Sequence, residues 1–456
     1  MSNNGAVSGY IDANLDRFRE ELFEFLRIPS VSARSEHNDD TREAAEWLMQ
    51  KMKHAGLETT LHETAGHPIL VGEWRGAGSD APTVLIYGHY DVQPPEPLDL
   101  WTSPAFEPEI RDGRIYARGS VDDKGQLYLH VKAIEAHLKA NGRLPVNVVM
   151  LAEGEEEVGS ENLMPFVEKH VDLLKTDAVV ISDSTMFAPG MPSIGVSLRG
   201  LAYFEIRVRG AKSDLHSGSY GGAVANPATA LARIIASFHD DDGHILIDGF
   251  YDDVVAAPEF VEQIRTLPFD EQEYIAEVGA PALVGEKGYT TYERLWIRPT
   301  CEVNGLLSGY TEEGAKTVLP AYAMAKVSCR RVPDQDPKKI EKLFQKHVEK
   351  VAPSGVTVEV LVLHGGKPWR ARLEGSLYEA GARALRHAFG RDVIYAGEGG
   401  SIPIVSEFER VLGAPALLMG FGLPGENAHA PDEWMSVENF EKGTHASARL
   451  LEELGS

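Results

Sequence analysis

The chain has 456 residues, of which 43% are hydrophobic and 25% charged, a composition typical of a globular protein. A single hydrophobic core stops growing at about 250–300 residues, so we expect two domains. The 69 acidic residues outnumber the 44 lysines and arginines and give a net charge of −25. This charge argues against nucleic acid or an anionic membrane as a partner, because both attract clustered positive charge.

Cysteine content and the N-terminus bear on metal chemistry and location. The two cysteines, Cys301 and Cys329, are too few for a disulfide framework and lack the spacing of a metal site. Any metal ion must therefore be held by histidines and carboxylates. The N-terminus has neither the basic nor the apolar region of a signal peptide, and no apolar run approaches the ~18 residues of a membrane span. We therefore expect a cytoplasmic protein.

The first part of the chain alternates between helical and strand-like patterns. Apolar residues at helical spacing predict helices over 11–26, 40–55 and 126–140. Three short runs, nearly all apolar and rich in β-branched residues, predict buried strands: 84–87, 146–151 and 178–181. The order strand, loop, helix, strand indicates an α/β fold with a mostly parallel sheet flanked by helices.

The pattern changes near residue 197. Apolar and charged residues alternate over 204–209, as in a half-solvated strand. Asn226 and Pro227 are typical of the first positions of a helix, which we expect to run to about residue 238. Similar patterns then predict a strand over 323–332, a helix over 337–351 and a strand over 356–363. These elements predict a smaller α+β domain, inserted over 197–370.

After Pro368 the earlier pattern returns. We expect helices over 376–389 and 437–454 and strands over 392–395 and 415–419. His429 lies in this stretch, so a catalytic domain that includes it must be discontinuous. We expect that domain to comprise residues 1–196 and 371–456.

Five acidic or histidine-bearing signatures stand out: Gly88-His89-Tyr90-Asp91, Asp122-Asp123-Lys124-Gly125, Glu153-Gly154-Glu155-Glu156-Glu157, Ser182-Asp183 and Asn427-Ala428-His429. Several of them directly follow a strand-like apolar run. In open α/β sheets ligands bind beyond the carboxyl ends of the strands, where these polar groups are expected to lie. The arrangement predicts a buried di-metal hydrolytic site.

The residue types suit two divalent cations about 3.5–4 Å apart that activate water. The candidate metal ligands are His89, Asp122, Glu157, Asp183 and His429. Asp91, two residues after His89, can accept the second imidazole N–H and so fix the tautomer. Glu156, next to Glu157, is then left as the general base that moves a proton from water to the leaving amine.

Each signature alone is weak, because a histidine near a strand end is usually only hydrogen-bonded and a Glu-rich run is usually a solvated surface. Together, in a βαβ context, they favour one joint site. Asp177 is an alternative to Asp183, but it precedes its apolar run whereas Asp183 follows it. Ser401 could suggest a Ser-His-Asp triad, but no Gly-x-Ser-x-Gly elbow surrounds it.

The motifs closely resemble those of a family of di-zinc exopeptidases. They are Gly88-His89-Tyr90-Asp91-Val92-Gln93-Pro94, Arg118-Gly119-Ser120-Val121-Asp122-Asp123-Lys124-Gly125, Glu153 to Gly159, Asp214-Leu215-His216-Ser217-Gly218 and Gly399-Gly400-Ser401-Ile402-Pro403. The family includes aminoacylase, carboxypeptidase G, succinyl-diaminopimelate desuccinylase and the carnosinase-like dipeptidases. The resemblance spans about residues 10 to 450 and is greatest to the cytosolic nonspecific dipeptidase and carnosinase branch.

The resemblance implies a division of the metal ligands. Asp122 would bridge the two ions, with His89 and Asp183 completing one position and Glu157 and His429 the other. It also implies a cis peptide between Asp122 and Asp123. Zn²⁺ is the expected metal and Mn²⁺ an alternative, since both accept mixed His and carboxylate ligands.

The resemblance also implies roles for the inserted domain, which would act as a lid and pair two subunits. His216 would reach across the homodimer interface to stabilise the oxyanion. Arg330 would bind the substrate carboxylate, although Arg331 could be the true clamp and Arg330 could pair with a structural carboxylate. Four further positions would line the substrate cleft: Thr317, Glu398, Gly400 and Ser401.

These features predict a metal-dependent dipeptidase acting on small peptides with a free C-terminal carboxylate. In the resembling family, Asp at the position of Asp183 goes with dipeptidases and aminopeptidases, and Glu with deacylases and carboxypeptidases. An N-acyl-amino-acid amidohydrolase remains an alternative, although Glu398 would suit the free ammonium group of a dipeptide. A non-hydrolytic metal-binding scaffold is a second alternative, but such a scaffold has no need of Glu156.

Overall fold

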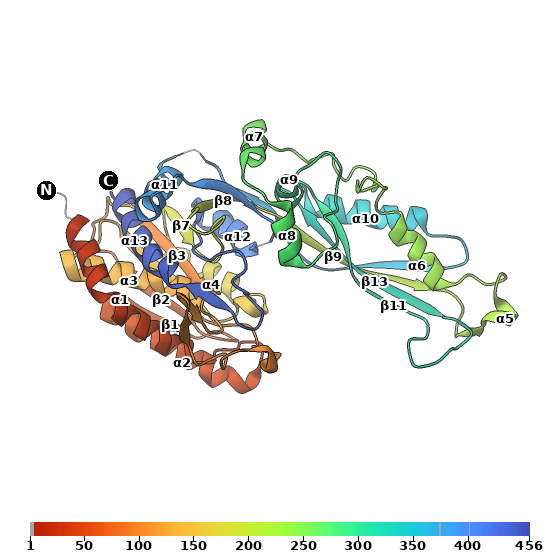
Figure 1. Cartoon of the computed structure of the whole chain (residues 1–456), viewed down its shortest axis with the longest axis horizontal. Helices are drawn as coiled ribbons and strands as arrows, with labels where there is room; N and C mark the ends of the chain where they lie inside the picture. Colours follow the sequence, from red (N-terminus) through yellow and green to blue (C-terminus); the bar gives the residue numbers. More distant parts are fainter. Residues whose placement is uncertain (1–3, 374, 401) are drawn as a thin grey trace. The chain divides into compact units, whose positions relative to one another are not determined.

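The computed structural model describes residues 4–373, 375–400 and 402–456, which form two compact units (Figure 1). Unit 1 contains the described residues up to Val196, together with Ala371–Ala396 and Glu407–Ser456. Unit 2 contains Ser197–Arg370 and the described residues of Gly397–Ser406. The divisions between the units fall after residues 196 and 370. The segment Gly397–Ser406 groups with unit 2, although the sequence placed it in the catalytic domain.

Unit 1 contains most of a mixed sheet of nine strands, of which the short strand β15 belongs to unit 2. The main path of the sheet runs β1-β2-β6-β3-β7-β17-β8-β15, with β16 paired to β8. The strands are β1 (Glu58–His62), β2 (Ile69–Trp74), β3 (Thr83–His89), β6 (Asn147–Glu153), β7 (Ala178–Ile181), β8 (Ser193–Leu198), β15 (Trp369–Arg370), β16 (Ile394–Glu398) and β17 (Ala416–Leu418). Pairing is parallel through the centre, β6-β3-β7-β17, and antiparallel between β1, β2 and β6 and on both sides of β8. The predicted α/β class is confirmed, with a sheet that is parallel only in its centre.

Helices cover both faces of the central strands, which explains their uninterrupted apolar sequences. On one face, a Cβ at Gly88 of β3 would lie 2.9 Å from Leu127 of α3 (Lys124–Asn141). On the other face, the neighbouring Tyr87 packs edge-on against Phe408 of α12 (Pro403–Leu412). Helix α3 also contacts three other helices: α1 (Asn4–Leu26), α2 (Asn38–Ala55) and α13 (Val437–Leu454).

Unit 2 contains a four-stranded antiparallel sheet in the order β11-β13-β9-β14. Its strands are β9 (Gly200–Arg209), β11 (Thr300–Ser308), β13 (Tyr322–Arg331) and β14 (Thr357–Gly366). One face is covered by α6 (Pro227–Ala236) and α10 (Pro337–Val351), whose apolar side chains share a core with Phe204 and Ile206 of β9. Cys301 and Cys329 are free, buried and directly opposite each other on β11 and β13.

Helix α11 (Ser376–Phe389) packs against α13. The remaining elements are short: α4 (Leu163–Lys169), α5 (Ser217–Tyr220), α7 (Pro258–Thr266), α8 (Glu271–Val278), α9 (Thr291–Trp296), β4 (Glu109–Arg111), β5 (Arg114–Tyr116), β10 (Leu215–His216), β12 (Val318–Leu319), β18 (Trp434–Ser436) and the 3-10 helices Ser35–His37, Leu98–Leu100 and Glu156–Val158. Strands β18, β5 and β4 form a small antiparallel sheet, and β10 pairs with β12. Among the described residues, no helix is both long and apolar enough to cross a membrane.

Candidate metal centre

Strand ends and helix starts bring the predicted ligands together at one edge of the sheet in unit 1. His89 is the last residue of β3, and Asp183 follows β7 by two residues. Asp122 lies in the loop that leads into α3, joined to Asp123 by a cis peptide. The two parallel strands end at the same edge of the sheet, so their polar residues meet there.

At this edge the backbone of β3 and the side chain of Asp123 approach each other closely. The Asp123 carboxylate accepts a hydrogen bond from the His89 amide at 3.2 Å. A Cβ at residue 88 would lie only 2.6 Å from Asp123 Oδ2, so Gly88 is required for this approach. The Gly-His pair of the sequence motif therefore has a steric cause.

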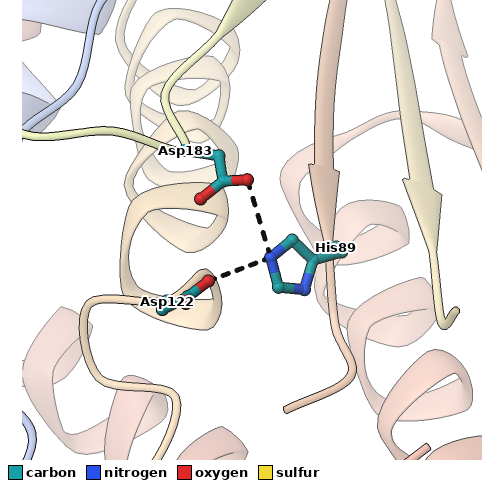
Figure 2. Close-up of side chains that lie close together, drawn as sticks. All are labelled: His89, Asp122 and Asp183. Carbon is teal, nitrogen blue, oxygen red and sulfur yellow. Dashed lines mark hydrogen bonds and ion pairs between the residues drawn. The ribbon is translucent and has the colours of Figure 1, made fainter. Parts of the chain in front are cut away.

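The two oxygens of Asp122 point to two different histidines. Oδ1 lies 3.1 Å from His89 Nε2, and Oδ2 lies 2.8 Å from His429 Nε2. His89 Nε2 is also 3.9 Å from Asp183 Oδ2. Figure 2 shows the side chains of His89, Asp122 and Asp183 and the dashed lines that join His89 to the two aspartates. On the other side, His429 Nε2 is 3.3 Å from Glu157 Oε2. Asp122 is thus shared between two triads, each with ligand atoms within 4.8 Å of one another.

The electrostatics of the cluster suit divalent cations. Burial and then the neighbouring Asp122 raise the pKa of Asp183 well above its ordinary value. Contacts with Asp122 and Glu157 raise the pKa of His429 to about 10. Burial disfavours the charged form of His89, yet hydrogen bonds to Asp122 and Asp91 raise its pKa well above its usual range. Metal ligands must be deprotonated, so cations would take the place of the protons that this crowded set of carboxylates otherwise retains.

One buried atom fits the same interpretation. Among the described residues, Glu157 Oε1 has no hydrogen-bond partner although it is buried. A buried carboxylate oxygen without a donor is costly, and a metal ion would satisfy it. The residues present therefore fit two divalent ions, one in each triad.

Asp91 contacts residues of both triads. Its Oδ1 lies 3.3 Å from His89 Nδ1, and the same imidazole nitrogen is 3.1 Å from the Asp91 backbone carbonyl. The carboxylate also accepts hydrogen bonds from the amides of Glu156 and Glu157, at 3.3 and 3.1 Å. Asp91 thereby orients the first histidine and the turn that carries the acidic pair.

Sequence reasoning missed two polar neighbours of this set. Ser32 Oγ donates to Asp91 Oδ2 at 2.6 Å, and Gln93 Nε2 donates to Glu157 Oε2 at 2.8 Å. Gln93 belongs to the Gly88–Pro94 motif and could have been suspected from its place after Asp91. Ser32 lies 59 residues from its partner and has no local signal.

Glu156 begins the 3-10 helix Glu156–Val158, beside the candidate metal ligand Glu157. Burial raises its pKa to about 7, with further contributions from the charges of Glu157 and Asp122 and an opposing one from His89. A carboxylate with a pKa near neutrality can both accept and release a proton at physiological pH.

Asp177, the alternative to Asp183 as a ligand, lies at the opposite end of β7, where it accepts a hydrogen bond from the Thr83 amide at 2.8 Å.

Two of the predicted residues from the resemblance lie beside each other in unit 2. His216 on β10 is paired with Val318, and the amide that follows it, Ser217 N–H, donates to the Thr317 carbonyl at 3.1 Å. His216 is exposed, and its Nδ1 accepts the Gly218 amide at 3.1 Å. A neutral imidazole that accepts at Nδ1 carries its proton on Nε2, which is then a donor.

The two neighbouring arginines of β13 face opposite sides of the strand. Arg331 is buried and donates to the carbonyls of Leu201 and Gly366 at 2.8 and 2.7 Å, so it is used within the sheet. Arg330 is half-buried, and burial lowers its pKa. Burial and then the positive charge of Arg330 lower the pKa of Arg199 to about 10, which marks an electropositive region in unit 2. This arrangement favours Arg330 over Arg331 as an anion-binding residue.

The remaining cleft candidates belong to one segment of unit 2. The Glu398 carbonyl accepts the Arg199 amide at 3.3 Å, and Arg199 Nε donates to the Gly399 carbonyl at 3.0 Å. Gly400 is exposed. Ser401 lies outside the described residues.

The mixed sheet and the shared carboxylate of Asp122 fit the class of di-metal hydrolases, and comparison with known proteins gives the family. Residues 85–453 match the family described as Peptidase family M20/M25/M40. The chain is 33% identical to the Cys-Gly metallodipeptidase dug1 of Schizosaccharomyces pombe, over 98% of this chain and 97% of that protein. It is 31% identical to the Beta-Ala-His dipeptidase of Homo sapiens, over 96% and 86% of the two chains.

A solved structure gives the same result. The M20 family metallo-carboxypeptidase Sso-CP2 from Sulfolobus solfataricus superposes with a TM-score of 0.84 at 35% identity, over 96% of this chain and 99% of that one. The chain therefore belongs to peptidase family M20/M25/M40, which confirms the resemblance found in the sequence.

Proposed function

We propose that the protein is a metal-dependent dipeptidase. The observation that carries the proposal is the sharing of the Asp122 carboxylate between two triads, with Glu156 beside them. His89, Asp122 and Asp183 would hold one ion, and Asp122, Glu157 and His429 the other. Zn²⁺ suits this mixed set of nitrogen and oxygen ligands, and Mn²⁺ is the alternative. Two such cations, when bound, polarise a carbonyl and lower the pKa of water.

Glu156 would act as the general base. Its raised pKa of about 7 allows the carboxylate to take a proton from the attacking water and return it to the leaving amine. Asp91 would keep the turn that carries Glu156 in place through the hydrogen bond from the Glu156 amide. Proton transfer of this kind contributes about 10²–10⁴-fold to a rate.

A dipeptide substrate agrees with the names of the similar proteins, a Cys-Gly metallodipeptidase and a Beta-Ala-His dipeptidase. Arg330 would bind the C-terminal carboxylate, supported by the electropositive region it forms with Arg199. Glu398 would receive the N-terminal ammonium group, with Thr317, Gly400 and Ser401 lining the substrate cleft.

His216 would donate its Nε2 proton to the oxyanion from the second subunit of a homodimer. Support comes from its exposure and from the Gly218 contact at Nδ1, which leaves Nε2 protonated. Mixing inactive His216→Ala chains with inactive Glu156→Gln chains tests this role. Heterodimers should regain activity, because one site then has its own Glu156 and receives His216 from the partner. Tagged heterodimers that stay inactive would contradict donation across an interface.

A second candidate function is carboxypeptidase activity on longer peptides, which the likeness to the Sulfolobus solfataricus metallo-carboxypeptidase favours.

The cytoplasmic location stays a prediction, supported by the two free cysteines.

Turnover of a substrate panel tests the proposed function. After reconstitution with Zn²⁺ or Mn²⁺, the protein should hydrolyse free dipeptides faster than N-blocked dipeptides, longer peptides, or N-acetyl and N-succinyl amino acids. Preference for N-blocked or longer peptides would favour the carboxypeptidase. Preference for the N-acyl amino acids would favour the deacylase, and no turnover of any compound by protein that holds two ions would favour a binding scaffold.

A further inference from the structure

The carboxylate of Glu433 is buried beneath the segment that carries Asp122. Glu433 precedes β18 and is fully excluded from solvent. Its Oε1 accepts the amides of Val121 and Asp122 at 3.0 and 3.2 Å. Its Oε2 accepts the Gly119 amide at 2.9 Å and Arg118 Nη1 at 2.7 Å. Four residues between 118 and 122 thus each donate one hydrogen bond to the same carboxylate.

These donors fix the backbone on the N-terminal side of the shared ligand. The Asp122 amide itself is held, so the direction in which its side chain leaves the backbone is set by Glu433. The Ala117 amide also donates to the Glu433 carbonyl at 3.1 Å. The loop from 117 to 122 is therefore held in place by hydrogen bonds to both the backbone carbonyl and the side-chain carboxylate of Glu433.

The same residue is connected to the second metal-ligand loop. Glu433 lies four residues after His429, and Arg118 Nη2 donates back to the Ala430 carbonyl at 3.3 Å. Asp432 accepts from the amide and hydroxyl of Thr102 at 2.8 and 2.7 Å, which fixes the end of that loop. The 2.8 Å contact between His429 and Asp122 is thus made by two loops that Glu433 and Arg118 join.

We propose that Glu433 is a positioning residue for the two-metal site, which sets the placement of Asp122 relative to His429. The proposal rests on the metal site of the proposed function. Groups that hold a metal ligand in place are commonly worth 10–100-fold in metal affinity. Here one carboxylate acts on the ligand that both triads share, so its loss should affect both ions.

The competing explanation is that Arg118 and Glu433 form a buried ion pair that matters only for stability. Glu426 offers a matched control, because it is a buried glutamate of the same C-terminal loop. Its carboxylate accepts the amides of Leu423 and Ser436, at 2.7 and 3.1 Å, and not those of the Asp122 segment. Glu426→Gln therefore measures what loss of a buried carboxylate does by itself.

The test compares Glu433→Gln with Glu426→Gln by two measurements on the full-length protein. One is the affinity for Co²⁺ in competition with a chelator, and the other is the visible absorption spectrum of the bound Co²⁺, which reports ligand geometry. In Glu433→Gln, the NH₂ group of the new side chain would face donors and lose the hydrogen bonds on its side. We expect Glu433→Gln to bind Co²⁺ about 10–100-fold more weakly with an altered spectrum, and Glu426→Gln to match the wild type in both.

Wild-type affinity and spectrum in folded Glu433→Gln would overturn the proposal, whatever its melting temperature. Should this variant fail to fold, Glu433→Asp decides by the same measurements. The aspartate keeps the charge that faces Arg118 but is too short to reach all four donors, so weaker Co²⁺ binding is expected and unchanged binding would contradict the proposal. A wild-type protein that binds no Co²⁺ would instead contradict the metal site itself.

Discussion

The two ligand triads share Asp122 but are built in different ways. His89 ends a central strand and its side chain is completely buried, whereas the side chain of His429 is 55% exposed. His429 lies in a loop where Asn427, His429 and Asp432 all have positive φ angles, a conformation that is uncommon for residues other than glycine but that Asn, Asp and His adopt more readily than most. One triad is thus held by the sheet, and the other depends on a loop that contacts with Thr102 and Arg118 hold in place.

The difference implies unequal metal positions. A buried ligand side chain loses little conformational freedom when an ion binds, whereas an exposed side chain such as that of His429 loses more and leaves its ion more open to water. We therefore expect the ion at His89 and Asp183 to be the more tightly held.

Asp122→Ala should have the largest effect, because it removes the residue common to both triads. We expect loss of both ions and of all detectable turnover, measured by metal analysis after dialysis and by a dipeptide assay. Retention of two ions would show that Asp122 does not bridge them.

Glu156→Gln should have the second-largest effect on turnover. Glu156 belongs to neither triad, so its replacement should leave the candidate metal ligands intact. We expect turnover to fall by about 10²–10⁴-fold while both ions are retained. Its neighbour provides the matched control, since Glu157→Gln removes a ligand and should lower the metal content. The reverse result would exchange the roles of the two glutamates.

His89→Ala and His429→Ala measure the asymmetry directly. We expect His89→Ala to weaken the tighter ion and to destabilise the fold, because it also leaves a cavity in a buried strand end. His429→Ala should mainly weaken the other ion, with a smaller change in melting temperature. Equal losses of affinity and stability in the two variants would contradict the comparison.

The smallest expected effect concerns His130, a buried histidine next to the segment that carries Asp183, and the pH dependence of stability. His130 on α3 bonds to Ser182, next to Asp183, at 2.8 Å and to Ser447 at 2.7 Å. Burial lowers its pKa to about 3. An unfolded histidine titrates near 6.5, so the unfolded state binds more protons between these values and stability falls as the pH drops below about 6.5.

Between pH 7 and pH 5 this single group should cost about 2 kcal/mol of unfolding free energy. His130→Gln keeps a donor and an acceptor but cannot titrate. Its unfolding free energy, measured with urea on metal-free protein, should therefore fall by about 2 kcal/mol less than that of the wild type over the same pH range. Equal pH dependence in the two proteins would show that His130 is not held neutral by burial.

Much of the fold could be predicted because its signals are local. The helices Pro337–Val351, Ser376–Phe389 and Val437–Leu454 begin and end where capping residues and apolar spacing placed them, and β7 covers the predicted 178–181. The strand β8 and helix α12 were not predicted, since their short apolar patterns fit either element type. The antiparallel edges of the sheet were missed because strand direction depends on connections that leave no mark on the strands themselves.

The candidate site divides in the same way. Ligand types and the acidic pair Glu156-Glu157 follow from motifs, and the structure brings the five predicted ligands together in unit 1. Contacts across long separations could not be predicted: Glu433 lies 311 residues from Asp122, and in sequence the pair Asp432-Glu433 resembles a solvated acidic turn. Which of Arg330 and Arg331 is buried and donates within the sheet depends on which face of β13 is covered, and a run of two arginines does not reveal this.

Anomalous X-ray diffraction at the zinc edge from crystals of the zinc-loaded protein would locate the bound ions relative to Asp122. We predict two peaks about 3.5–4 Å apart, one on each side of the Asp122 carboxylate, with the peak at His89 and Asp183 at full occupancy and the peak at His429 and Glu157 the first to weaken on partial chelation. A single peak, or peaks that do not share Asp122, would contradict the account.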